Sequence, residues 1–327
     1  MILHENNTLF KEAVVSAASR MGIPEIYVEK DYWVTKALHE IFHSAIGAEA
    51  VFKGGTALSK CFGLIERFSE DIDLVVLQEE GESGNKLGNK LKKITKAVGS
   101  ILEEVEEAGI TNKKGMIRKV AYDYPKVFEG VYGQVRNKII VEATWLGRFE
   151  PYHQQNISSY VFEMMKEVGQ LSVAEEYGLL PFEVNVLDAR RTICEKIMSL
   201  IRFSYGEDPI ADLQAKIRHT YDIYQLLQEA DIKEFFDSSK FEEMLVLVGQ
   251  DDVASFKTKN EWLEKHPKDA LIFSKTEETW NQLKATYSND FKNLVYGELP
   301  DENDVLEVIL MVSRRLQNIN WTVKTST

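Results

Sequence analysis

The chain is poor in cysteine: its 327 residues include only Cys61 and Cys194. Two cysteines so far apart form neither a metal-type cluster nor a disulfide framework. No run reaches the ~18–20 apolar residues that a membrane-spanning helix needs. The N-terminal stretch MILHENNTLFKEAV has acidic and amide residues where a secretory signal has an apolar segment. We therefore expect a cytoplasmic protein that does not enter a membrane.

Positive charge is also scarce, because the formal net charge is −13. This argues against a cationic coat for polyanions over the whole protein. Residues 86–138, the basic span, nevertheless contain twelve Lys or Arg and six Asp or Glu, so they carry +6 and the remainder carries −19. The basic span either steers a phosphate-rich partner to one side of the protein or is a solvated lysine-rich helix.

The periodicity of apolar residues predicts two kinds of domain in a chain that is 44% hydrophobic. Residues 1–180 alternate strands and helices, which predicts an α/β (α+β) domain with a small mixed sheet. Residues 181–327 have helical periodicity and predict a mainly helical domain. Within the first domain we expect helices at 8–20, 28–46, 55–64 and 85–109, and strands at 49–53, 71–77, 115–125 and 134–146.

The stretch FKGGTALSKCFGLIERFSEDIDLVV carries the strongest chemical pattern. Asp71 and Asp73 alternate with apolar residues on a predicted strand, so both carboxylates lie on one face. Two carboxylates one pleat apart can hold a hard divalent cation such as Mg²⁺ or Mn²⁺, and such a cation can bridge the phosphates of a nucleotide. The alternative is an ordinary strand with solvent-facing aspartates.

A glycine turn precedes a short helix upstream of these aspartates. Gly54 and Gly55 allow backbone N–H groups to approach a phosphate closely, and the helix that follows presents its positive end. Thr56 can add a hydroxyl donor there. Ser69 has the same strand parity as the two aspartates and can contact a phosphate or orient a ligand. We predict that these four residues bind nucleotide.

The arrangement of strand, Gly-Gly-Thr turn, short helix and D-x-D strand resembles the DNA polymerase β-like nucleotidyltransferase superfamily. The segments FKGGTALSK, RFSEDIDL and EKDYWVTKAL more closely resemble the AbiEii-type nucleotidyltransferase toxins of type IV toxin–antitoxin systems. The resemblance extends through scattered motifs to about residue 227. It implies a nucleoside triphosphate substrate, an antitoxin encoded nearby and, as in some members, nucleotide addition to tRNA.

The resemblance also implies roles for later residues. A third metal-binding carboxylate is expected on a later strand, where Glu142 is the candidate; the alternative is an outward-facing glutamate. Lys196 matches a lysine that contacts nucleotide phosphate and acts in catalysis. Asp222 matches a catalytic aspartate that is either a base for the incoming hydroxyl or an orienter of Lys196. Its alternative is an ion pair with Arg218, four residues earlier on the same helix.

A competing pattern is HEIFH, which matches the zinc-protease motif H-E-x-x-H and places His39 and His43 on one helix face. A zinc site needs a third protein ligand. Glu66 is a candidate third ligand, but a zinc site that includes it would replace the interpretation of the glycine turn as a nucleotide-binding site. The simpler interpretation is two histidines on a partly exposed helix.

The sequence therefore predicts a Mg²⁺-dependent nucleotidyltransferase toxin with a role in phage defence. It would transfer NMP from an NTP to RNA, with the tRNA 3′ end as the first candidate. Growth arrest would be reversed by the antitoxin. Two alternatives remain: a nucleotidyltransferase for a small molecule such as an aminoglycoside, and a nucleotide-binding protein without catalysis.

Overall fold

The computed structural model describes residues 1–130, 135–256 and 260–325. Contacts between residues divide the chain into two compact units. The N-terminal unit comprises Met1–Gly63, Arg67–Trp145 and Tyr152–Leu187, and the C-terminal unit comprises Leu64–Glu66, Leu146–Pro151 and Asp188–Thr327.

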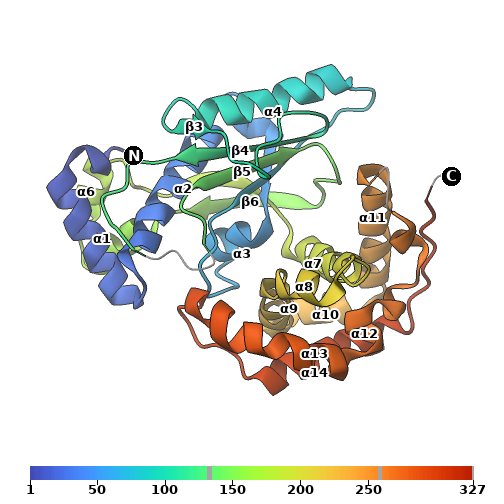
Figure 1. Ribbon diagram of the computed structural model, residues 1–327. Helices are drawn as coiled ribbons and strands as arrows, with labels where there is room; N and C mark the ends of the chain where they lie inside the picture. Colours follow the sequence, from blue (N-terminus) through green and yellow to red (C-terminus); the bar gives the residue numbers. More distant parts are fainter. Residues whose placement is uncertain (131–134, 257–259, 326–327) are drawn as a thin grey trace. The chain divides into compact units, whose positions relative to one another are not determined.

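A mixed sheet forms the centre of the N-terminal unit (Figure 1). Among the described residues it has seven strands in the order β3-β4-β5-β2-β1-β7-β6. The strands are β1 (Ala50–Lys53), β2 (Ile72–Val76), β3 (Glu103–Val105), β4 (Ile117–Asp123), β5 (Ile139–Thr144), β6 (Tyr152–Ile157) and β7 (Phe182–Leu187). Strands β1 and β7 are parallel, as are β2 and β5, and the other neighbours are antiparallel. The predicted fold class, α/β with a mixed sheet, is confirmed.

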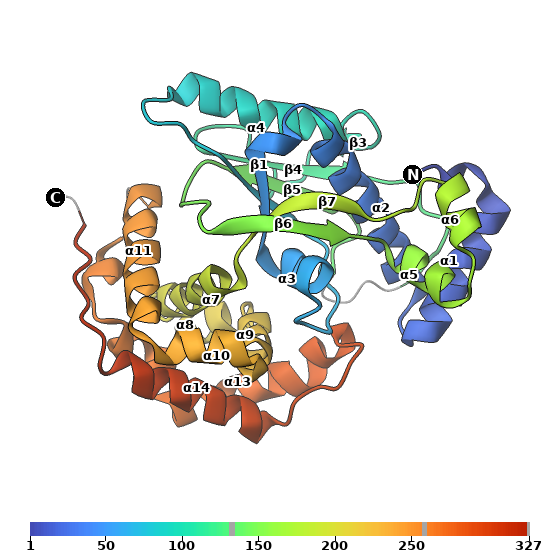
Figure 2. The ribbon, with the colours of Figure 1, turned by 180° about the vertical axis from the view of Figure 1, so that it is seen from behind.

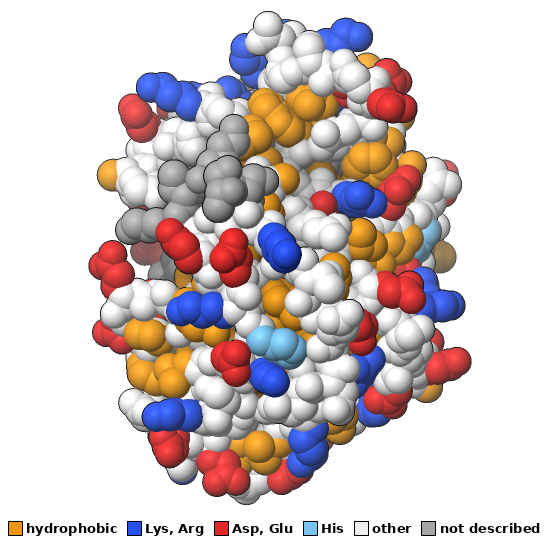
Figure 3. Space-filling view, turned by 90° about the vertical axis from the view of Figure 1, so that its right-hand side faces the viewer, with side chains coloured by type: hydrophobic (Ala, Val, Ile, Leu, Met, Phe, Trp, Pro, Cys, Tyr) orange, Lys and Arg blue, Asp and Glu red, His pale blue; other side chains and the backbone are white. Residues whose placement is uncertain are grey.

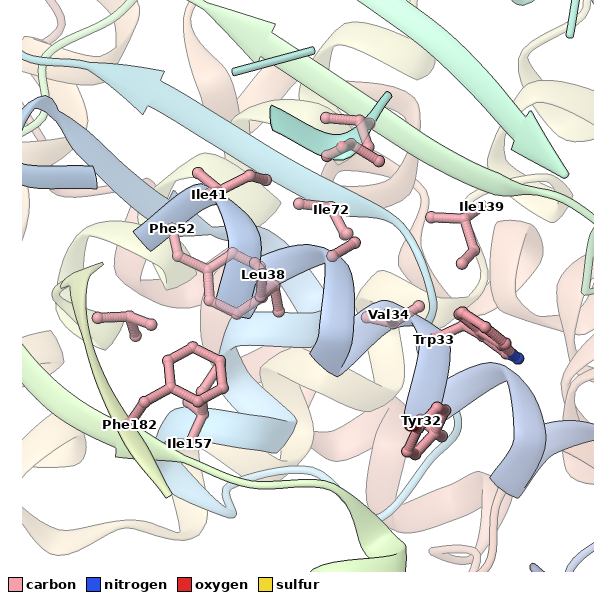
Figure 4. Close-up of a cluster of buried hydrophobic side chains, with 14 of the residues drawn as sticks. Tyr32, Trp33, Val34, Leu38, Ile41, Phe52, Ile72, Ile139, Ile157 and Phe182 are labelled. Atoms are coloured by element: carbon pink, nitrogen blue, oxygen red, sulfur yellow. The ribbon is translucent and has the colours of Figure 1, made fainter. Parts of the chain in front are cut away.

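The helices of the unit are α1 (Asn7–Met21), α2 (Glu25–His43), α3 (Gly54–Phe62), α4 (Gly84–Val98), α5 (Tyr160–Glu167) and α6 (Leu171–Glu176). Helices α2, α3 and α4 contact the sheet, whereas α1 packs on α2 and α5. Figure 4 shows how Val34, Leu38 and Ile41 of α2 lie against Phe52 and Ile72 of the sheet. Because strand side chains alternate, Asp73 lies on the opposite face from its neighbours in β2.

Two features differ from the sequence prediction. Helix α4 ends at Val98 rather than at Gly109, and Gly99 follows it with an N–H that still donates to the Thr95 carbonyl. The residues that follow form the short edge strand β3. Strands β6 and β7 were not predicted. Strand β6 (YHQQNI) is a polar edge strand without an apolar stripe, so its sequence does not indicate a strand. Gln134, where the fourth strand was expected to begin, lies outside the described residues.

The C-terminal unit consists mainly of helices, which Figures 1 and 2 show from opposite sides. They are α7 (Ala189–Phe203), α8 (Pro209–Gln214), α9 (Arg218–Gln228), α10 (Ala230–Asp237), α11 (Ser239–Ser255), α12 (Leu271–Ser274), α13 (Thr276–Ala285) and α14 (Glu302–Leu316). The predicted domain boundary after residue 180 precedes β7, which belongs to the sheet. In the part of the chain that is described, no helix combines the length and apolar character needed to cross a bilayer.

Candidate active site

The pairing of β2 with its neighbour brings acidic side chains together on the face of the sheet opposite α2. Asp73 lies opposite Glu142 in the parallel β2–β5 pair, and Glu142 lies opposite Lys119 of β4. Residues opposite each other in register project to the same face. Asp71 directly precedes β2 and has the same parity as Asp73. The structure therefore places all three predicted carboxylates on one face.

The glycine turn faces one of these carboxylates directly. Gly54 has φ +81°, a left-handed conformation that favours glycine. A Cβ atom at this position would lie 2.4 Å from Oδ2 of Asp73. The missing side chain therefore lets the backbone at the start of α3 approach the carboxylate.

The predicted nucleotide-binding hydroxyls also meet at this turn. Thr56 Oγ1 and Ser69 Oγ are 2.9 Å apart and share a hydrogen bond. A Cβ atom on Gly55 would lie 3.0 Å from Ser69 Oγ. Gly54, Gly55, Thr56 and Ser69 thus converge beside Asp73.

Arg67 is a residue of this site that the sequence interpretation missed. Its side chain is buried, its Nη1 donates to the Phe68 carbonyl at 3.2 Å, and Nη2 lies 2.6 Å from the place of a Cβ on Gly55. A guanidinium at a glycine turn is suited to a phosphate. The available signal was a cationic residue two positions before Ser69 in RFSEDID.

The negative charge of the clustered carboxylates is only partly compensated by nearby cationic side chains. Withdrawal from water, and then the negative charges of Glu142 and Asp71, raise the pKa of Asp73 to about 7. Asp71 Oδ1 is buried and has no hydrogen-bond partner among the described residues, while Oδ2 lies 3.6 Å from Nη1 of Arg136. Like charges held together in this way favour a bound cation.

The donor set of the aspartates fits a hard divalent metal such as Mg²⁺. Mg²⁺ is often held by one or two carboxylates, with waters and substrate phosphates as the other ligands. Asp71 and Asp73 meet this need, and the unpartnered Oδ1 of Asp71 is a ready donor atom. No group of three or more His, Cys, Asp or Glu suited to a metal is found in the described residues. Glu142 accepts a hydrogen bond from Lys119 at 2.7 Å, so its role as a third ligand stays a prediction.

Helix α2 carries consecutive buried charges in the EKD segment behind this site. Lys30 is fully buried, donates to the carbonyl of Arg136 at 2.5 Å and lies 3.9 Å from the buried Glu70. Burial lowers the pKa of Lys30 to about 8. Because Glu70 precedes Asp71 and Arg136 contacts it, Lys30 supports the segments that position Asp71.

The C-terminal unit holds the other two predicted catalytic residues together. Lys196 of α7 donates to Oδ2 of Asp222 in α9 at 2.6 Å, and both side chains are buried. Asp222 therefore contacts Lys196, and the catalytic roles of the two residues stay predictions. Among the neighbouring arginines, Arg190 pairs with Asp188, and Arg191 pairs with Asp251 at 2.5 Å.

The HEIFH segment forms an aromatic cluster in the structure. The rings of His39 and His43 stack with centroids 3.8 Å apart, and both contact the ring of Phe182 edge-on. His43 Nδ1 is also 2.9 Å from the His39 carbonyl oxygen. This packing accounts for the two histidines without a ligand.

A carboxylate-bearing strand beside a glycine turn, in a mixed sheet, is the arrangement expected of a nucleotidyltransferase. Comparison with solved structures agrees in fold: MenT4, a nucleotidyltransferase toxin from Mycobacterium tuberculosis H37Rv, superposes with a TM-score of 0.52. The two sequences are 16% identical, and the match covers 94% of this chain and 90% of MenT4. A search of curated proteins finds no match.

The family comparison is more specific than the fold. The family described as nucleotidyl transferase AbiEii toxin, Type IV TA system, matches residues 36–310. The chain belongs to this family, as its motifs predicted. It is a nucleotidyltransferase toxin whose family implies an NTP substrate and an antitoxin partner, so the alternative of a binding protein without catalysis is set aside.

Proposed function

We propose that this toxin is a Mg²⁺-dependent enzyme that transfers NMP from an NTP to an RNA acceptor, with the 3′ end of tRNA as the first candidate. The observation that carries the proposal is the approach of the Gly54 backbone to Asp73, beside an Asp71 oxygen that has no hydrogen-bond partner in the described part of the chain. This pairs a phosphate-binding turn with acceptors for a divalent cation.

The residues of the N-terminal unit would hold the triphosphate. Backbone N–H groups after Gly54 and the hydroxyls of Thr56 and Ser69 would donate to its phosphate oxygens, and Arg67 would add charge-assisted bonds. Asp71 and Asp73 would bind the cation, which when bound neutralises phosphate charge during in-line displacement.

The transfer exchanges a phosphoanhydride bond of the NTP for a phosphodiester bond to the acceptor. The acceptor hydroxyl oxygen bonds to the α-phosphorus and gives up its proton to solvent, while the bond from the α-phosphorus to the oxygen bridging to the β-phosphate breaks and pyrophosphate leaves. We assign Lys196 to compensating charge on the phosphates, held in orientation by Asp222. The alternative for Asp222, a base for the hydroxyl proton, is less consistent with its contact to Lys196.

An RNA acceptor is favoured by the basic span, whose exposed lysines include Lys86, Lys92 and Lys114. Neutralising backbone phosphates supplies most of the non-specific affinity for nucleic acid. Modification of tRNA ends would stop translation and arrest growth, which matches the proposed action as a phage-defence toxin. Its antitoxin would counter this action by direct binding or by another route.

The experiment is incubation of the purified protein with each labelled NTP, Mg²⁺ and total RNA. The proposal predicts label in a tRNA-sized band with one or more NTPs, and none when EDTA removes the metal. Label confined to a small-molecule fraction would instead support the aminoglycoside-type alternative. Transfer that persists in EDTA would refute the metal requirement.

A further inference from the structure

A cleft of about 470 Å³ lies in the N-terminal unit between α4, the segment before β4 and the end of β5. This volume is within the range of pockets that hold small organic ligands. Its charged lining residues are Lys92, Lys113 and Arg118, and none of the residues described as lining it is acidic. Lys113 pairs with Glu104, so Lys92 and Arg118 are the cations available to a ligand. Such a lining is unusual in a protein with 52 acidic residues.

Helix α4 presents one polar face to the cleft. Asn85, Gly88, Asn89 and Lys92 follow each other at the spacing of three and four residues that defines a helix face. Lys92 has no ion-pair partner among the described residues. Lys90, outside the cleft, contrasts with it, because its amine contacts both Glu82 and Glu49 at 2.8 Å.

The sheet side of the cleft supplies an oriented guanidinium. Arg118 Nε donates to Thr95 Oγ1 at 2.7 Å, which fixes the group while its terminal nitrogens can still donate. Strand alternation sends Arg118 to the α4 face and Lys119 to the face of Glu142. The cleft and the carboxylates of the candidate active site therefore lie on opposite faces of one sheet.

An aromatic ring borders the same space. Trp145, directly after β5, lines the cleft, and its Cζ3 atom lies 3.7 Å from the place of a Cβ on Gly88. A Cβ there would be in ordinary van der Waals contact with the indole, so the ring lies close to the α4 backbone. Cations, amides and an aromatic ring are the groups with which proteins hold the phosphates, base edge and base plane of an unpaired nucleotide.

We propose that this cleft binds a nucleotide within a single-stranded segment of RNA. Its base stacks on Trp145, Asn85 and Asn89 contact the base edge, and flanking phosphates lie on Lys92 and Arg118. The proposal rests on the RNA acceptor of the proposed function. Because the carboxylates lie on the other face of the sheet, the cleft holds a part of the RNA away from its reacting end.

Local charge is what makes this cleft selective for an anion. On the face drawn in Figure 3, acidic and basic side chains are interspersed and no large field of one sign is present. A protein of net charge −13 repels RNA at long range unless a local group of cations receives it. The cleft combines such a group with a surface for stacking.

The test is a titration of the holoprotein with a fluorescent ten-nucleotide oligouridine, in Mg²⁺ and without NTP. Lys92→Glu should weaken binding about tenfold and lower the slope of log K against log salt by about one, since one phosphate contact is lost. Lys93→Glu is the matched control: it makes the same charge change at the next exposed position of α4, outside the cleft. It should change affinity less than twofold.

Tryptophan emission tests the stacking contact independently. Oligouridine should quench part of the emission of the native protein, and Trp145→Phe should remove that quenching while the far-ultraviolet circular dichroism is unchanged. Free UMP and heparin serve as further probes. Binding of heparin with the same affinity, or equal losses in Lys92→Glu and Lys93→Glu, would show a general anion surface and overturn the proposal. Saturable binding of UMP without oligouridine binding would also overturn it.

The test of the cleft can fail or succeed independently of the test of the proposed function. Asp73→Asn should lose transfer but bind oligouridine like the native protein. If Lys92→Glu binds oligouridine normally while RNA labelling proceeds, the cleft proposal fails and the function stands. If oligouridine binding follows the predicted pattern but no RNA is labelled, the assigned reaction fails and the cleft remains an RNA site.

Discussion

Asp31 and Asp73 are two acidic side chains of the N-terminal unit with opposite surroundings. Asp31 is buried and accepts hydrogen bonds from Lys60 Nζ at 2.6 Å and from the Tyr160 N–H at 2.8 Å. Asp73 has no ion-pair partner among the described residues, and its acidic neighbours, led by Glu142, help to raise its pKa to about 7.

The difference separates a structural charge from a charge available to a ligand. A buried ion is costly unless the fold supplies a partner, and α3 supplies Lys60 to Asp31. At Asp73 the fold instead adds further acids and a glycine turn that leaves room. The candidate active site is therefore the place where the protein leaves a charge to be compensated by something that binds.

The largest expected effect is on transfer. Asp73→Asn keeps the shape of the side chain but removes its charge, so we expect the rate of nucleotide transfer to fall on the order of 10³-fold. Initial rates with labelled NTP and Mg²⁺ measure it. Asp237→Asn, at an exposed aspartate of α10, is the control and should stay within twofold. A rate near that of the native protein in Asp73→Asn would remove the metal role.

Substitution of Asp31, the structural acid, should lower stability rather than the rate of transfer. Asp31→Ala leaves Lys60 buried without its partner, which should lower the free energy of unfolding by about 3–5 kcal/mol. Urea unfolding measures this loss, and the transfer rate per folded molecule should change little. The double variant Asp31→Ala/Lys60→Met should lose less than the sum of the single variants. Additive losses would show that the pair is not coupled.

The pair in the C-terminal unit resembles the structural pair in geometry but is assigned to catalysis. Lys196→Met and Lys60→Met each remove the amine of a buried lysine–aspartate contact of 2.6 Å. We expect Lys196→Met alone to lower transfer by roughly 10²-fold in folded protein. Transfer rates normalised to the folded fraction separate a catalytic loss from a loss of stability. Equal normalised rates for Lys196→Met and Lys60→Met would make Lys196 a structural residue.

The smallest effect concerns stability. The pKa of Asp73 is raised in the fold, so its ionisation opposes folding, and stability is lost as pH rises from about 4 towards 7. Asp73→Asn should therefore be more stable than the native protein by about 1–2 kcal/mol above pH 7, after allowance for screening by water. The gain should disappear below pH 4. Metal-free thermal melts across this range measure it, and a constant difference at every pH would contradict it.

Much of the candidate site could be predicted because its signals are local. Alternation placed Asp71 and Asp73 on one face, and the glycine pair marked a turn before a helix; the structure confirms this geometry. The family was predicted from the same motifs and is confirmed by the match over residues 36–310. The catalytic and binding roles of the residues stay predictions.

The missed features depend on contacts between distant segments. The polar sequence of β6 does not indicate a strand. The strand forms because its backbone makes hydrogen bonds to β7. The role of Lys30 depends on Glu70 and Arg136, which lie far from it in sequence. The helix was expected to reach Gly109 because the helical periodicity of the sequence continues past Gly99. In the structure the residues after Gly99 instead pair as β3 with β4, so tertiary pairing prevails over helical propensity.

The most direct measurement is a crystal structure of the protein with Mg²⁺ and a non-hydrolysable NTP. The account predicts a metal at about 2.0–2.1 Å from oxygens of Asp71 and Asp73, with phosphate oxygens at the backbone after Gly54. Metal and triphosphate bound elsewhere, or aspartates turned away from the glycine turn, would contradict it.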